Sequence, residues 1–187
     1  MFAGLLRWLL LGLVLIGAGV MLLVLFSLVS LELPEDCTTA DSAMEAQDHD
    51  RAIKHYFLCL EAEELPQGVQ AQIFFNLGNA YSAKGNHHQA IEDYSDALYL
   101  DPSHGWAYNN RCWSRGLLRQ STEALRDCDV ALKLLPDRPE VLDSRALAYW
   151  QLGELDKARE DLAHAHEIEP SFPTADERFG QFEEMFP

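Results

Sequence analysis

Apolar and polar residues follow two different patterns along this chain of 187 residues. The first is a segment from Trp8 to Leu31 that contains no charged residue. As a helix it is about 36 Å long at about 1.5 Å per residue, and the hydrocarbon core of a bilayer is about 30 Å thick. We therefore expect residues 1–31 to form a transmembrane signal-anchor helix.

A cleaved signal peptide is the alternative for this segment. Such peptides have an apolar stretch of about 7–15 residues followed by a small-x-small cleavage site. Here the apolar stretch is longer, and the only suitable triplet, Thr38-Thr39-Ala40, lies well beyond its end. The pattern favours the uncleaved anchor, and the cleaved form stays open.

The basic residues beside the segment predict its orientation. Arg7 precedes it, and no Lys or Arg follows it until Arg51. Because basic flanking residues stay on the cytoplasmic side, we expect a single-pass protein with a cytoplasmic N-terminus. The rest of the chain then lies outside the cytoplasm, in the periplasm if the source is bacterial.

The second pattern is a period of 34 residues. Small residues and prolines recur in one register through three units. The recurring residues are Ala90, Ala124 and Ala158; Ala97, Ala131 and Ala165; and Pro102, Pro136 and Pro170. A period of this length is typical of repeat proteins, in which each unit buries its apolar face against its neighbours.

This period and its residues resemble the tetratricopeptide repeat. The best-matched unit is residues 71–104, and residues 105–138 and 139–172 form two more. The signature positions of the first unit hold Phe74, Leu77, Gly78, Tyr81, Ala90, Tyr94, Ala97 and Pro102. Arg111 and Arg145 depart from the pattern by replacing the usual leucine. The resemblance implies an α-solenoid of paired helices.

Weaker units are expected at both ends of the repeats. Residues 32–70 read as a juxtamembrane segment and a degenerate hairpin, and residues 173–187 read as one capping helix with an apolar stripe of three phenylalanines. The predicted fold is therefore all-α, with an N-terminal transmembrane helix followed by a solenoid. The solenoid has three clear repeats, one degenerate N-terminal repeat and a C-terminal capping helix, about nine helices in all.

In this family the first helix of each repeat lines an inner groove that binds extended peptides or partner helices. Asparagine amides can donate to and accept from a peptide backbone, and exposed tryptophans are enriched at interface hot spots. Packing within the fold is the alternative for each tryptophan. The resemblance places ten side chains in the groove: Phe75, Asn76, Asn79, Trp106, Asn109, Asn110, Trp113, Asp143, Leu147 and Trp150.

Co-chaperone members of the family bind a C-terminal carboxylate through two asparagines and several basic residues. Asn79 and Asn110 match the asparagines, but Phe75, Glu140 and Ser144 stand at the basic positions. A buried carboxylate needs charged donors, so we do not expect a carboxylate clamp. An acidic groove favours a neutral or basic partner.

The chain has four cysteines, an even number that permits disulfides outside the cytoplasm. The repeat register places Cys112 and Cys128 on the two facing helices of one hairpin, and Cys37 and Cys59 on those of another. We hypothesise one disulfide within each hairpin, provided the Cα atoms come within about 7 Å. Buried free thiols are the alternative.

Charge and motifs limit the chemistry. The formal net charge is −16, which disfavours nucleic acid as a partner. There is no CxxC, no glycine-rich phosphate loop and no serine elbow, so we expect no metal, no cofactor and no catalytic residue. The acid clusters Glu92-Asp93-Asp96 and Glu160-Asp161 are interpreted as a solvated outer face.

Together these patterns predict a membrane-tethered scaffold or adaptor in envelope protein assembly or maturation. It would dock a partner peptide or helix in its groove and carry out no bond chemistry. Two alternatives stay open: a secreted or periplasmic binding module released by signal cleavage, and a non-catalytic subunit of an enzyme complex.

Overall fold

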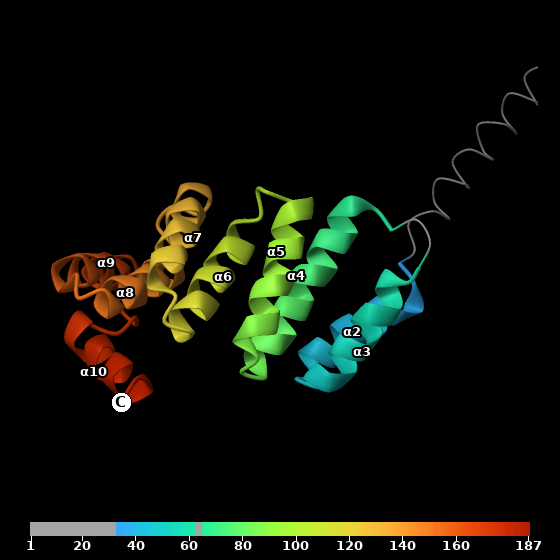
Figure 1. Ribbon diagram of the computed structural model, residues 1–187, viewed down its shortest axis with the longest axis horizontal. Coiled ribbons are helices and arrows are strands. Elements are labelled where there is room, and N and C mark those ends of the chain that lie inside the picture. Colours follow the sequence, from blue (N-terminus) through green and yellow to red (C-terminus); the bar gives the residue numbers. More distant parts are fainter. Residues whose placement is uncertain (1–32, 63–64) are drawn as a thin grey trace, which may run out of the picture. The chain divides into compact units, whose positions relative to one another are not determined.

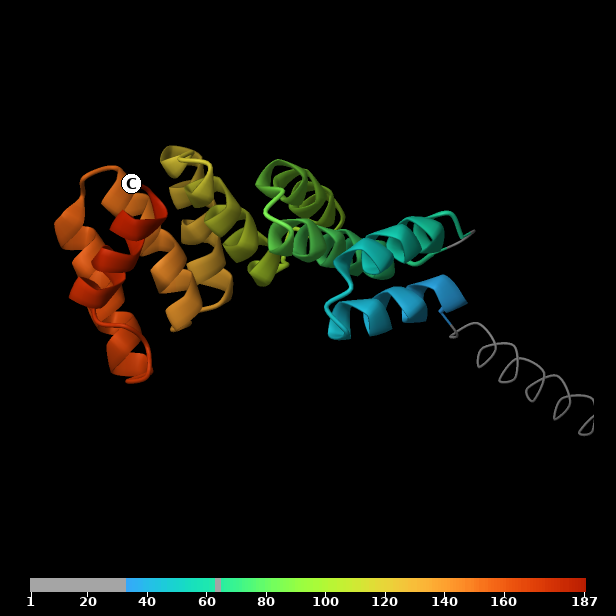
Figure 2. The same ribbon diagram turned by 90° about the horizontal axis from the view of Figure 1, so that it is seen from below.

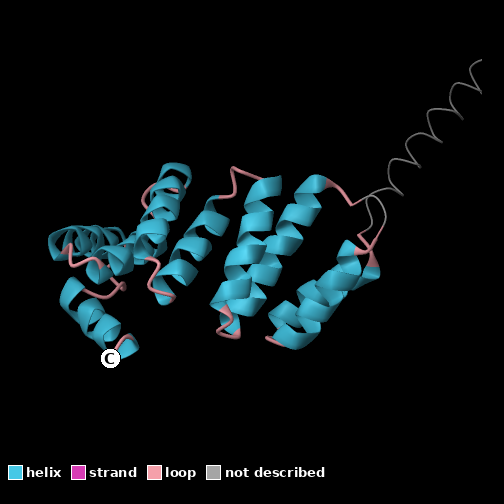
Figure 3. Cartoon of the chain, viewed as in Figure 1, coloured by secondary structure: helices cyan, strands magenta, loops and turns pink. Residues whose placement is uncertain are grey.

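The computed structural model describes residues 33–62 and 65–187. The predicted anchor at residues 1–31 lies outside the described residues. Among the residues described, no helix is long and apolar enough to cross a membrane. Residues Glu35–Pro187 form one compact unit, and its described part consists of helices and loops without a strand (Figure 3).

Nine helices make up the described part of this unit. They form four antiparallel pairs and one single C-terminal helix (Figure 1). The helices are α2 (Glu35–Glu45), α3 (His49–Leu60), α4 (Gln67–Ala83), α5 (His87–Leu100), α6 (Gly105–Leu117), α7 (Ser121–Leu134), α8 (Pro139–Gln151), α9 (Leu155–Ile168) and α10 (Ala175–Met185). Each pair packs on the next through α3 on α4, α5 on α6 and α7 on α8, which confirms the all-α solenoid.

Small residues let the two helices of a pair approach closely. Ala90 and Ala97 on α5 are fully buried, and Gly78 on α4 lies against the ring of Tyr94. A Cβ atom at Gly78 would stand 2.5 Å from Cε1 of Tyr94, so no larger residue fits without movement of that ring. The alanine and glycine register of the sequence is therefore a packing requirement.

All four hairpin turns use a residue with positive φ at the same position. Gly85 and Gly153 have φ of 76°, and Gln47 and Arg119 have φ of 56° and 57°. This conformation brings the chain back for the second helix, whose first turn is then capped by the side chain of Asp48 in one hairpin and of Asn86 in the next. Glycine adopts positive φ without strain, whereas Gln47 and Arg119 do not.

Two disulfides join the paired helices. Cys37 on α2 is bonded to Cys59 on α3, with Cα atoms 5.0 Å apart. Cys112 on α6 is bonded to Cys128 on α7, with Cα atoms 5.5 Å apart. All four cysteines are buried. Each bond therefore fixes one hairpin from the inside.

The interpretation of the acid clusters as a solvated face is wrong for two residues. Glu92, Asp96 and Glu160 are exposed as expected, but Asp93 and Asp161 are only 4% and 6% exposed. These two residues occupy the same repeat position, on the side of the second helix that faces the first. Both aspartates stand next to exposed acids in the sequence, and helical periodicity alone does not show which acid of each cluster is buried.

Arginines of the first helices bind the inward-facing aspartates in two repeats. Arg111 donates two hydrogen bonds to Asp127, at 2.8 and 2.7 Å. Arg145 does the same to Asp161, at 2.8 and 2.7 Å. The arginines that depart from the family pattern thus supply the partners that these buried carboxylates need.

Candidate partner-binding groove

A hydrogen-bonded cluster on the first helices ties consecutive repeats together. Oδ1 of Asn79 on α4 accepts from the hydroxyl of Tyr94 on α5 at 2.9 Å and from Nδ2 of Asn110 on α6 at 2.8 Å. Burial raises the pKa of Tyr94, so its hydroxyl stays a donor at neutral pH. Asn79 and Asn110, two of the four predicted groove asparagines, therefore bind each other as well as lining the groove.

The same arrangement occurs one unit earlier. The hydroxyl of Tyr56 donates to Oδ1 of Asp41 at 2.6 Å, and Nδ2 of Asn76 donates to the hydroxyl of Tyr56 at 2.9 Å. Sequence analysis missed Asp41. The signal was present, because Asp41 precedes Asn79 by 38 residues, the same offset that separates Tyr56 from Tyr94.

A hollow of about 490 Å³ lies beside this cluster. It brings together three of the predicted groove residues, Asn79, Asn110 and Trp113, from two successive repeats. The full lining is Asn79, Ser82, Ala83, His87, Tyr94, Asn110, Trp113 and Leu117. Amide and indole donors thus stand beside apolar surface, a combination that suits a peptide segment.

His87 contributes a polar atom that the sequence did not assign to the groove. It lies in the first turn of α5. Its Nδ1 is buried without a hydrogen-bond partner. Burial, followed by the nearby charge of His88, lowers the pKa of His87. The imidazole is therefore neutral at physiological pH.

Three further predicted residues pack within the fold. The Phe75 ring lies 4.4 Å from that of His104. Asn109 is buried and donates to Asn110 at 3.0 Å. The half-buried Trp106 lies under the guanidinium of Arg138, 5.7 Å from the ring centre. These side chains support the groove walls more than they offer contact surface.

The remaining predicted residues lie under α10. Asp143 accepts two hydrogen bonds from Arg178, both at 2.6 Å. Leu147 is fully buried in one apolar cluster with Phe179 and Phe182, and the Trp150 ring stands 5.6 Å from that of Phe182. Figure 2 shows α10 (red) beside the last hairpin, and its backbone lies nearest to that of α9. The α10 helix therefore covers the part of the groove formed by α8.

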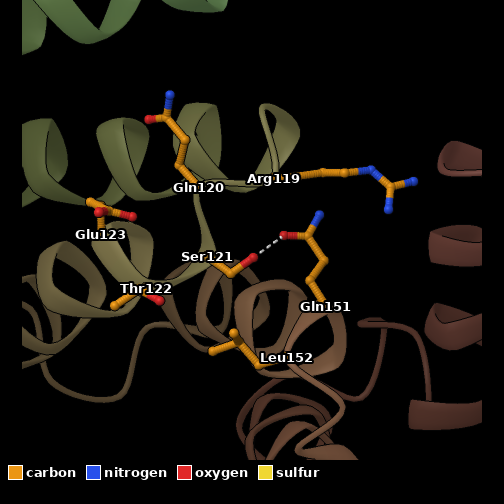
Figure 4. A pocket seen from close by; sticks show the side chains of 7 residues that line it. All are labelled: Arg119, Gln120, Ser121, Thr122, Glu123, Gln151 and Leu152. Atoms are coloured by element: carbon orange, nitrogen blue, oxygen red, sulfur yellow. Dashed lines mark hydrogen bonds between the residues drawn. The ribbon is translucent and has the colours of Figure 1, made fainter.

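A second, smaller hollow of about 240 Å³ lies at the turn between α6 and α7 (Figure 4). There Ser121 donates to Oε1 of Gln151 at 2.6 Å, and Gln151 donates to the carbonyl of Gly116 at 2.8 Å. These bonds hold α8 in register with the preceding hairpin. Within the described residues no group of three potential metal ligands occurs.

The fold and groove define a helical-repeat module for protein–protein interaction. Residues 71–104 and 139–172 match models of the tetratricopeptide repeat. The chain resembles the crystal structure of the MamA protein, with a TM-score of 0.68 and 25% identity over 80% of each chain. Residues Glu35–Pro187 thus form an all-α solenoid in which residues 71–104 and 139–172 are tetratricopeptide repeats.

Curated relatives are similar over parts of their length. A 65-residue stretch is 42% identical to mitochondrial import receptor subunit TOM34 of Homo sapiens and covers 35% of this chain and 21% of that protein. RNA polymerase II-associated protein 3 of Homo sapiens is 26% identical over 136 residues, 70% of this chain and 20% of that protein. The chain therefore spans about a fifth of the length of these relatives.

A solved neighbour carries a peptide. The structure described as the first TPR of Spaghetti (RPAP3) bound to HSP90 peptide SRMEEVD is 22% identical, with a TM-score of 0.56. The similarity covers 66% of this chain and 95% of that one. At this identity the likeness concerns the fold.

Proposed function

We propose that this protein is a membrane-tethered adaptor that docks a peptide or helix of a partner protein in its concave groove. The observation that carries the proposal is the hollow of about 490 Å³ at Asn79, Asn110 and Trp113. It offers fixed amide groups for a peptide backbone and an indole for an apolar side chain. Such rigid anchors bind with a small loss of conformational entropy.

The residues at the carboxylate-binding positions support a neutral or basic partner segment. The peptide in the solved Spaghetti structure, SRMEEVD, is acidic at its end. In this chain Phe75, Glu140 and Ser144 stand where carboxylate-binding members have basic residues. Glu140 is exposed and would repel such a peptide. We therefore propose a partner that differs in charge from that chaperone tail.

The tether and the cellular role rest on the sequence. The uncharged segment from Trp8 to Leu31 supports a membrane anchor, and Arg7 supports a repeat unit outside the cytoplasm. Two disulfides within the hairpins suit an oxidising compartment. A tether raises the effective concentration of any membrane-bound partner, which suits a role in envelope protein assembly or maturation.

Site-specific crosslinking tests the proposal. A photoreactive residue at Asn110 should capture one defined partner in the native membrane, and the same residue at Tyr99, which is 86% exposed, should not. Trp113→Ala should reduce capture from Asn110 at least tenfold. Equal capture from both positions, or none, would refute the groove as the binding site. Intact mass separates the tethered from the cleaved form.

A further inference from the structure

The α10 helix lies on the groove in the manner of a bound helix. Its Arg178 contacts Asp143 near the start of α8, and its Phe182 ring contacts Trp150 near the end, so the two helices run in the same direction. The contacts also extend back into the preceding repeat. The Arg178 guanidinium lies 5.6 Å from the centre of the Trp113 ring on α6.

The C-terminal end of α10 reaches still further along the solenoid. The Phe186 ring stands 6.1 Å from that of Trp150 and 4.9 Å below the guanidinium of Arg119, in the turn after α6. Arg159 on α9 also pairs with Asp176 and lies over the Phe179 ring, so side chains of α6, α8, α9 and the α6–α7 turn hold the helix.

The attachment of α10 carries an electrostatic cost. Burial raises the pKa of Asp143, and the hydrogen bonds and charge of Arg178 only partly reverse that rise. A buried carboxylate and guanidinium both lose their hydration when they form such a pair. Release of α10 would return both charges to water, which lowers the net cost of opening the groove.

The helix is also stabilised within itself. Thr174 and Glu177 form a capping box at its N-terminus, in which Glu177 accepts from the Thr174 amide at 2.8 Å. A capping box satisfies helix donors without any tertiary contact. Most of α10 is exposed, since only Phe179 and Phe182 among its residues are buried. The helix can therefore leave the groove without losing its own cap.

We propose that the groove exchanges α10 for a partner helix of the same chemistry. That helix carries an arginine for Asp143 and, one turn later, an aromatic side chain for Trp150, as Arg178 and Phe182 do. This inference rests on the proposed function, because it names the partner class of the same groove. In this proposal α10 competes with the partner, so the partner helix must bind the groove more tightly than α10 does.

A labelled peptide with the sequence of residues 173–187 tests the exchange on the full-length chain. The double variant Arg178→Ala/Phe182→Ala should bind it at least tenfold more tightly than the wild type, because its own helix competes less well. The matched control is Glu184→Ala, at an exposed residue of α10, which should behave as wild type. Adding Asp143→Asn to the double variant should weaken binding of the peptide again.

Equal affinity of the wild type and the double variant would overturn the exchange, as would no binding to a double variant that keeps wild-type helicity. If the double variant loses helicity, Arg178→Lys decides the matter, because it keeps Phe182 and the charge but loses the two parallel bonds. Its affinity for the peptide should exceed that of the wild type, and an equal affinity overturns the exchange. If the wild type formed a dimer in which each copy binds the α10 helix of the other, the occupant of the groove would be a second copy of this chain, and the proposal of a partner helix would be overturned.

The proposed function fails on a different readout. No capture from Asn110, in either the wild type or the double variant, would refute the proposed function even if the peptide exchanges. Equal capture of one partner by both forms would leave the proposed function standing and overturn the competition by α10.

Discussion

Asp93 and Asp127 occupy the same position in consecutive repeats, but only Asp127 has an arginine partner. Asp127 accepts from Arg111 and from Arg115, the latter at 2.5 Å. Asp93 is 4% exposed, and its Oδ2 is buried without a partner. The difference arises because Leu77 stands in the first repeat at the position of Arg111 in the second.

Asp93→Asn should stabilise the protein at neutral pH. Burial and then the charge of Asp96 raise the pKa of Asp93 from 3.8 to about 7. The folded state therefore disfavours the ionised form of Asp93. The resulting loss of unfolding free energy grows from about pH 4 to about pH 7 and stays constant at higher pH. We expect a gain on the order of 2 kcal/mol at pH 8 and none near pH 3.5. Urea unfolding at the two pH values checks this, with exposed Asp156→Asn as the control.

The same substitution at the equivalent residue should have the opposite sign. Asp127→Asn removes the charge that two half-buried arginines share, so Arg111 and Arg115 lose their counterion. We expect a loss of about 3–5 kcal/mol at pH 8. Urea unfolding beside Asp93→Asn gives a matched comparison. If Asp93→Asn and Asp127→Asn lowered the unfolding free energy by similar amounts, the arginine partner would not determine whether the substitution stabilises or destabilises the protein.

The bond between Cys112 and Cys128 should stabilise the α6–α7 hairpin. It closes a segment with a sequence separation of 16. Cys112→Ser with Cys128→Ser should therefore cost about 3 kcal/mol of unfolding free energy. Thermal unfolding measures the loss, and the paired Cys37→Ser and Cys59→Ser variant gives the α2–α3 hairpin for comparison. Non-reducing mass mapping that finds four free thiols in protein from its own compartment would contradict both bonds.

Gln47→Gly should stabilise the first hairpin. Gln47 has φ of 56°, a conformation that strains a residue with a Cβ atom. Glycine removes the strain but increases the entropy of the unfolded chain, so the net gain should be about 0.5–1 kcal/mol. The converse variant, Gly85→Ala, should lose about 1 kcal/mol. Chemical unfolding of both variants checks the sign, and a loss on Gln47→Gly would show that its side chain contributes a contact.

Most of the fold follows from the spacing of residues in the sequence. A 34-residue period fixes which positions must be small, and small positions at that spacing require paired helices. The same register places Cys112 opposite Cys128, where the structure has a disulfide. Even Asp41 carried a signal, in its offset of 38 residues from Asn79. Local pattern suffices here because each repeat contacts mainly its neighbours.

The groove could be predicted only in part. The sequence supplied Asn79, Asn110 and Trp113, and the structure places them around one hollow. It did not show that Asp143 and Trp150 lie under α10, because those contacts depend on how the side chains of α10 pack on the preceding helices. Nor did it show that Asp93 faces inward without a partner, since burial depends on which side chains from the neighbouring helix fill the space. The period determined the solenoid, and tertiary packing decided which part of its inner face is open.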